Sequence, residues 1–182
     1  MKKIVLAATA ALIFAPIAAH AQDDAAPRKI EPYVGVLGGF HDFDNESFNG
    51  GPPAGYRGYL VEGVAGVNAN IGGPIVLGVE GQVAKGFSKD IDWEYGAAGR
   101  IGLRAGKDSL FFAKVGYQWT NFAPLGVDSR DYHGTVYGAG VELSAADMGL
   151  SANRSNLRLR FQADTRGDFH SVRPMAGIVA KF

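Results

Sequence analysis

Apolar and polar residues alternate with a period of two along residues 170–182, and the same alternation recurs in seven earlier segments. In this last segment, Val172 and Ile178 share one face with small apolar residues, whereas Arg173 and Lys181 lie on the other face. A period of two is the period of a β-strand, because successive side chains point to opposite sides of a sheet. The alternation therefore predicts an all-β fold.

Eight alternating segments are separated by glycine-rich or polar stretches, such as residues 72–74 and 106–108. They span about 8–13 residues, which suits tilted membrane-crossing strands. We expect strands at residues 32–40, 58–70, 75–84, 93–105, 110–119, 132–144, 157–164 and 170–182.

The first 21 residues have the pattern of a secretory signal peptide. Lys2 and Lys3 precede an apolar run, and Ala19-His20-Ala21 fits a cleavage site, so we expect cleavage after Ala21. The alternative is a transmembrane anchor. The run is shorter than the ~20 residues that a spanning helix needs, and Pro16 interrupts it.

The remaining chain is predicted to comprise a flexible lead, residues 22–30, and one barrel domain, residues 31–182. The full chain holds 18 Lys and Arg against 18 Asp and Glu, which offers no electrostatic basis for binding nucleic acid. It has no Cys, which excludes disulfides and thiolate metal sites. No segment beyond the signal peptide is apolar enough for a helical span, so a membrane crossing requires a closed barrel.

Alternation alone also fits a soluble barrel, such as a lipocalin, with its apolar face inside. Aromatic placement distinguishes the two, because membrane barrels carry aromatic girdles at the interfaces. In an up-and-down barrel, most aromatic residues here gather at one rim, and Phe111 and Phe182 lie at the other. The predicted girdle comprises Phe40, Tyr59, Trp93, Tyr95, Tyr117 and Trp119.

The sequence resembles the small eight-stranded outer-membrane proteins of Gram-negative bacteria, in the OmpA-like and opacity-like group. The resemblance is carried by YVGVLGGF (33–40), VYGAGVEL (136–143), LRLRFQAD (157–164) and MAGIVAKF (175–182), in this order and spacing. It implies an eight-stranded antiparallel up-and-down transmembrane β-barrel in the outer membrane. Outer-membrane lipid and, during biogenesis, the barrel assembly machinery are the implied partners.

The resemblance also implies an assembly signal on the apolar face of the last strand, formed by Phe182, Ala180, Ile178 and Ala176. Two connections depart from the pattern of the group. Residues 144–156 are long for a periplasmic turn, and residues 165–170 are short for an outer loop.

Charged residues share the face opposite the apolar one and form the main candidate site. They are Glu62, Glu80, Glu94, Arg100, Arg104, Lys114, Glu142, Arg158, Arg160, Asp164, Arg173 and Lys181. An eight-stranded barrel is only wide enough for its own side chains, so these charges must pair inside it. A structural ion-pair network is the leading interpretation, and a gated, narrow ion path is the alternative.

A catalytic set is not evident. His170 and Ser171 are adjacent and so point to opposite faces, and Asp131, His133 and Thr135 fit polar residues at a rim. The acidic residues of the first loop fit a solvated loop better than a Ca²⁺ site. We expect no enzyme activity, cofactor or metal, and a structural or surface-interaction role, with an extracellular ligand bound through loops 41–57, 85–92 and 120–131. The alternatives are a narrow pore or transporter, or a lipid A-modifying enzyme.

Overall fold

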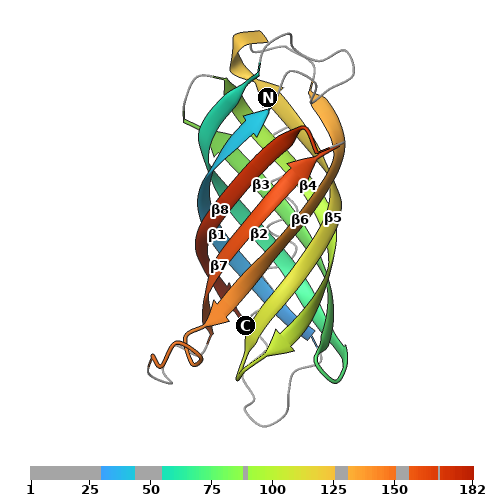
Figure 1. Ribbon diagram of the computed structural model, residues 1–182, viewed down its shortest axis with the longest axis vertical. Helices are drawn as coiled ribbons and strands as arrows, with labels where there is room; N and C mark the ends of the chain where they lie inside the picture. The colour runs from blue at the N-terminus through green and yellow to red at the C-terminus, as the bar shows by residue number, and fades with distance from the viewer. Residues whose placement is uncertain (1–29, 44–54, 88–89, 126–130, 151–155, 168) are drawn as a thin grey trace.

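Eight antiparallel strands close into a single barrel in the computed structural model, which describes residues 30–43, 55–87, 90–125, 131–150, 156–167 and 169–182 (Figure 1). Each strand pairs with its neighbours in the chain, and β8 pairs with β1. The elements are β1 (Ile30–Phe43), β2 (Arg57–Gly72), β3 (Ile75–Gly86), β4 (Ile91–Ala105), β5 (Ser109–Phe122), the 3-10 turn η1 (Ala123–Leu125), β6 (Tyr132–Ser144), β7 (Leu157–Arg166) and β8 (Ser171–Lys181). The predicted up-and-down barrel is confirmed.

The predicted signal peptide and residues 22–29 of the lead lie outside the described residues. Ile30, assigned to the lead, is the first residue of β1 and pairs with Ala69 of β2. The barrel wall therefore begins one residue earlier than predicted.

The two rims of the barrel differ in their connections. Short turns join β2 to β3 and β4 to β5 at one rim, where Ile30 and Lys181 also lie. The other rim carries the connections 44–56, 87–90, 123–131 and 167–170. Outer-membrane barrels have short periplasmic turns and longer extracellular loops, so we call these the periplasmic rim and the extracellular rim.

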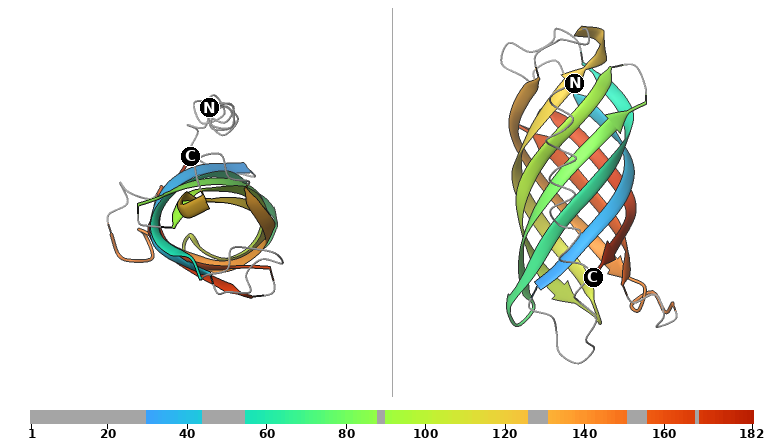
Figure 2. Two further views of the ribbon diagram at one scale, coloured as in Figure 1. Left: turned by 90° about the horizontal axis from the view of Figure 1, so that it is seen from above. Right: turned by 180° about the vertical axis from the view of Figure 1, so that it is seen from behind.

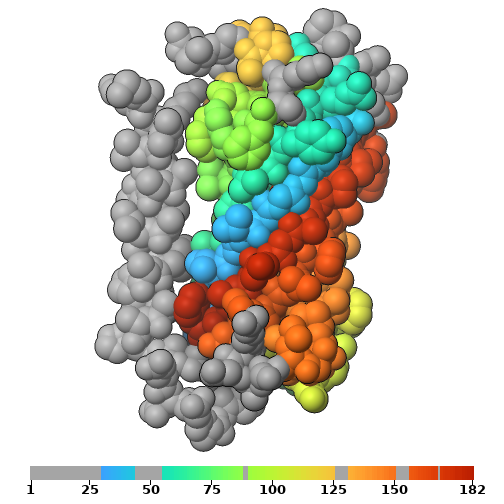
Figure 3. Space-filling model, turned by 90° about the vertical axis from the view of Figure 1, so that its left-hand side faces the viewer, coloured from blue at the N-terminus to red at the C-terminus, as the bar shows by residue number. Residues whose placement is uncertain are grey.

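The barrel is polar inside and apolar outside. Outward side chains such as Val79 (59% exposed) and Ile178 (54% exposed) cover the wall, whereas Arg160 and Arg173 are buried inside. β1 and β8 complete the wall side by side (Figure 3). A soluble barrel would have the reverse arrangement, so this one is built for lipid. No helix in the described part of the chain is long and apolar enough to cross a membrane.

Several strands run further toward the extracellular rim than predicted. β1 ends at Phe43 instead of residue 40, and β5 ends at Phe122 instead of residue 119. The backbone ladder continues beyond the apolar band, because hydrogen bonding does not require outward side chains to be apolar. β7 and β8 are the two shortest strands, with 10 and 11 residues.

Two inward glycines make room for the large side chains of the interior. A Cβ added at Gly66 would collide with Tyr33 Oη, and one added at Gly138 would collide with Asp164 Oδ1. Both neighbours belong to the ion-pair network of the lumen. These glycines therefore position the charged site rather than loosen the strands.

Candidate functional site

Every predicted lumen charge lies on an inward position of the barrel, and the structure joins these charges into two groups and a periplasmic cap. In the first group, Glu80 and Glu142 bind three arginines. Arg160 Nη2 lies 2.9 Å from Glu80 Oε1. Arg100 Nη2 and Arg158 Nη1 lie 2.8 and 2.9 Å from the two oxygens of Glu142. Because buried ions lose their hydration, each of these charged side chains depends on its partners.

Aromatic rings support this first group. Tyr33 donates a hydrogen bond of 2.7 Å to Glu80 Oε2 and accepts one of 3.0 Å from Arg100. The guanidinium groups of Arg100 and Arg160 stand over the Phe112 ring, at 4.5 and 4.6 Å from its centroid. Cation–π contacts strengthen when water is excluded, so the rings hold both arginines in place.

Arg173 is the centre of the second group. Its guanidinium nitrogens lie 2.8 Å from Glu62, 3.0 Å from Glu94 and 2.7 Å from Asp164. His41 Nδ1 lies 2.7 Å from Glu94 Oε1 on the extracellular side of the group. One arginine thus bridges carboxylates from three strands, β2, β4 and β7.

Lys114 joins the two groups. Its Nζ lies 3.1 Å from Asp164 and 3.6 Å from Glu80. Ion pairs therefore follow one another without a break from Glu94, which contacts His41 near the extracellular rim, to Lys181, near the periplasmic rim. We call this series the ion-pair chain.

The periplasmic end of the ion-pair chain is a cap around Asp108, in the turn between β4 and β5. Asp108 lies 2.9 Å from Arg158 and also contacts Lys181 and Arg104. Arg104 in turn binds Glu31 at 2.8 Å. Burial raises the pKa of the Asp108 carboxyl, but the charges of Arg158 and Lys181 outweigh burial and hold this pKa below its usual value.

Sequence reasoning missed five residues that take part in this interior. Glu31, Tyr33 and His41 lie on one face of β1, and the alternation along this strand could have predicted that their side chains point into the lumen. Arg166 continues the parity of the seventh strand, beyond the predicted end at residue 164. Asp108 lies in a turn, where the strand period gives no direction.

The extracellular end of the lumen holds a cluster of apolar side chains, which we call the apolar plug. The Phe122 ring packs against Phe43 at 5.3 Å, Tyr56 at 5.0 Å and Tyr132 at 5.6 Å between centroids. Leu60 and Ile91 are buried in the same cluster. The interior therefore carries an apolar cluster toward one end and a charged cluster toward the other.

The six predicted girdle residues lie on the outer face of strands, toward the extracellular rim. Tyr95 and Trp119 stack at 5.6 Å, and Tyr117 meets Trp119 edge-on at 5.0 Å. Phe40 and Tyr59 pair at 5.1 Å, and Trp93 contacts Lys85. Their position fits an interfacial belt.

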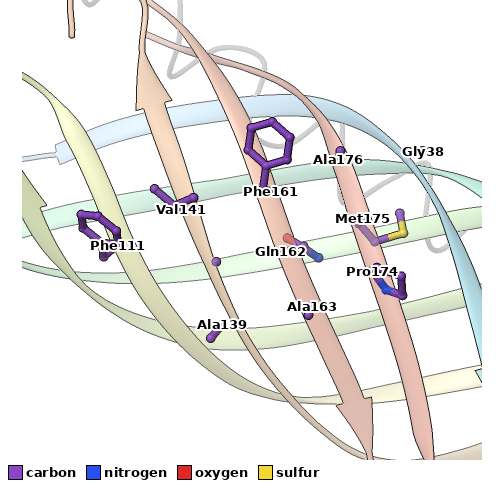
Figure 4. Close-up of a pocket in the computed structure, with 11 residues that line it drawn as sticks. Gly38, Phe111, Ala139, Val141, Phe161, Gln162, Ala163, Pro174, Met175 and Ala176 are labelled. Atoms are coloured by element: carbon purple, nitrogen blue, oxygen red, sulfur yellow. The ribbon is translucent and has the colours of Figure 1, made fainter. Parts of the chain in front are cut away.

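Three of the predicted assembly residues lie on β8, and Phe182 directly follows the strand. Ile178 and Ala176 stand opposite Val36 and Gly38 of β1, and the Phe182 N–H donates to Pro32 O at 2.9 Å. Close by, small side chains including Ala163 and Pro174 leave an open hollow of about 700 Å³ in the outer wall (Figure 4). In a membrane this hollow in the outer wall faces acyl chains.

The rim residues considered for lipid A chemistry bind aromatic neighbours. His133 Nδ1 lies 2.6 Å from Tyr117 Oη, and Asp131 accepts a hydrogen bond of 2.7 Å from Tyr95. Ser171 faces inward and accepts a hydrogen bond from the Arg166 backbone. No group of three His, Asp or Glu side chains within the described ranges is arranged to hold a metal ion. Residues 44–46 of the first loop lie outside those ranges.

Neither a family model nor a curated protein sequence matches this chain. The solved structures that are similar to this chain include two transmembrane barrels. Neisserial surface protein A (NspA) is 12% identical, with a TM-score of 0.55 over 87% of this chain and 100% of its own. A de novo designed transmembrane β-barrel is 15% identical, with a TM-score of 0.50 over 86% of this chain and 98% of its own.

The fold and the apolar wall are those of the small eight-stranded outer-membrane β-barrels. The chain is accordingly an integral barrel of the bacterial outer membrane.

Proposed function

We propose that this protein is a closed, non-conducting outer-membrane barrel with a structural or surface-interaction role and no catalytic one. The observation that carries the proposal is the unbroken ion-pair chain through the lumen. An eight-stranded barrel has an interior that side chains can fill, and here large buried arginines fill it. Opening an ion path would require several buried pairs to separate at once.

The apolar plug supports the same conclusion. Phe43, Phe122 and their neighbours stand between the ion-pair chain and the extracellular side. Apolar constrictions exclude ions because water leaves them. An ion would therefore meet two different barriers in series.

Exposed aromatic residues at the extracellular connections support surface interaction. Phe87 follows β3, and Phe169 precedes β8 and stacks on Tyr137. Phe169 has a φ of 68°, a conformation that bulky residues rarely adopt. Apolar groups exposed in loops on a rigid scaffold are typical of binding surfaces.

Planar-bilayer recording tests the closed state. The refolded barrel should give no steady current, and a stable, ion-selective current would favour the pore. Expression of the protein should leave the mass spectrum of lipid A unchanged, and a new lipid A species would favour the enzyme.

Surface interaction is tested separately, with cells that display the barrel and a panel of immobilised proteins and polysaccharides. The Phe87→Ser/Phe169→Ser double variant should lose the retention that the parent shows. Val79→Ala, which changes the lipid-facing wall, should keep it. Equal retention of all three proteins would remove the aromatic residues from the interaction.

A further inference from the structure

The connection between β6 and β7 begins with a compact turn at the periplasmic rim, residues 145–150, which we call the foot. Met148 N–H donates to Ser144 O at 3.2 Å, and Leu150 N–H donates to Ala145 O at 2.9 Å. The foot extends sideways from the barrel wall in two perpendicular views (Figure 1 and Figure 2). It is a defined element and does more than join two strands.

Asp147 fixes the foot to the barrel. Its carboxylate accepts hydrogen bonds from the backbone N–H groups of Lys107 at 2.7 Å, Asp108 at 3.2 Å and Ser109 at 2.9 Å. It also accepts from the hydroxyl groups of Ser109 at 2.6 Å and Ser144 at 2.8 Å. The four donors from residues 107–109 hold the foot against the turn between β4 and β5 and the start of β5.

This anchoring leaves an apolar outer surface. Asp147 is the only charged residue in the sequence AADMGL of the foot, and its charge is engaged by the neighbouring turn. Met148 (37% exposed) and Leu150 (51% exposed) remain open to the surroundings. The foot thus exposes two large apolar side chains while its single carboxylate is bound to the backbone of the neighbouring turn.

The position of the foot identifies what covers these side chains. The foot is hydrogen-bonded to the base of β7 through Ala145 N–H and Leu157 O, at 3.2 Å. Leu157 and Phe182 point outward at this level and border the lipid-facing wall. Apolar groups at such a boundary bury themselves between headgroups and acyl chains.

We propose that the foot is a membrane-anchoring element that inserts Met148 and Leu150 into the interfacial layer of the periplasmic leaflet. Its partner is a phospholipid surface. Asp147 is the residue that holds the foot in this position.

The chain has no Cys, so single labels can be placed cleanly. Met148→Cys and Leu150→Cys carry the environment-sensitive fluorophore NBD, in barrels refolded into phosphatidylcholine/phosphatidylglycerol vesicles. Leu103→Cys, on the outer wall, is the lipid control, and Lys107→Cys, in the neighbouring turn, is the water control. Labels at 148 and 150 should emit at short wavelength and be quenched by spin-labelled lipid, as at 103.

Asp147→Ala, made in the Leu150→Cys background, tests whether Asp147 holds the foot in position. Retained gel mobility of the unheated sample shows that the barrel is folded. The emission at 150 should move toward the value at 107. Unchanged emission would overturn the role of Asp147. Labels at 148 and 150 that respond like the label at 107 would overturn the lipid partner, and so would self-quenching at high protein density, which would indicate a second copy.

Discussion

Arg158 makes the shorter contact with Glu142, at 2.9 Å, although the register sets Arg160 directly opposite Glu142 at the β6–β7 pair. Arg160 lies 3.8 Å from Glu142 and directs its guanidinium across the lumen to Glu80 on β3. The arginine in register is thus recruited by a distant strand, and its neighbour takes its place. The interior is connected across the barrel as well as along adjacent strands.

Removing one charge from this arrangement should destabilise the barrel. We expect Glu142→Gln to lower the free energy of unfolding by about 3–5 kcal/mol, because Arg100 and Arg158 lose a buried partner. Urea unfolding in lipid vesicles, followed by gel mobility of unheated samples, measures the change. Asp92→Asn, which breaks a partly exposed pair with Lys85, is the control and should cost less than about 1 kcal/mol. Equal losses of unfolding free energy in the two variants would show that removing a partner in the lumen costs no more than removing a partly exposed one.

Glycine positions in the wall should differ sharply in tolerance. We expect Gly66→Ala to cost about 1–3 kcal/mol, because the new methyl group would displace Tyr33 from Glu80 and Arg100. Gly38→Ala places the same methyl group in open space on the outer face and should be close to neutral. A loss of stability in both variants would point to strand flexibility rather than to the Tyr33 site.

The periplasmic rim should resist acid. The pKa of Asp147 is held below its usual value by hydrogen bonds from Ser109, Lys107 and Ser144, and that of Asp108 by its cationic neighbours despite burial. A lowered carboxyl pKa gives stability that is complete above the unfolded pKa of about 4 and is lost as the pH falls through the folded pKa.

The foot should therefore stay attached between pH 7 and pH 4. NBD emission at Leu150→Cys should remain constant over this range and change only in stronger acid. A transition near pH 5 would show that the carboxylate of Asp147 is not bound as described.

Phe182 is expected to act in assembly more than in packing. It is partly exposed on the outer face, so Phe182→Ala should change the unfolding free energy of the refolded barrel little. In cells, the same variant should lower the amount of barrel in the outer membrane. Fractionation and immunoblotting measure this, with Phe111→Ala as a matched aromatic loss at the same rim. Normal insertion of the Phe182 variant would contradict the assembly role.

The alternation of side chains along each strand predicts the fold and the face on which nearly every charged residue lies. This is because, in a closed barrel, one face of every strand points into the lumen and the other points outward. The alternation could not predict partners across the lumen. Arg160 and Glu80 are 80 positions apart, and their meeting depends on strand tilt and stagger, which parity does not contain.

The alternation along the strands also could not predict the contacts between turns. Asp108 and Asp147 lie between strands, and only the three-dimensional proximity of two turns shows that the second holds the backbone of the first. The sequence shows that the 144–156 connection is unusually long, but nothing in its composition indicates that Asp147 binds the backbone of the turn between β4 and β5.

The inward charges of the ion-pair chain are distributed so that the two halves of the barrel have an excess of opposite sign. Strands β1 to β4 direct Glu31, Glu62, Glu80 and Glu94 into the lumen against two arginines, Arg100 and Arg104. Strands β5 to β8 direct six cations against Glu142 and Asp164, namely Lys114, Arg158, Arg160, Arg166, Arg173 and Lys181. An open half-sheet would expose an excess of one sign to the bilayer. The first half carries an excess of two negative charges and the second an excess of four positive charges, and these excesses offset each other only when β8 meets β1. Insertion and closure should therefore occur as a single cooperative event.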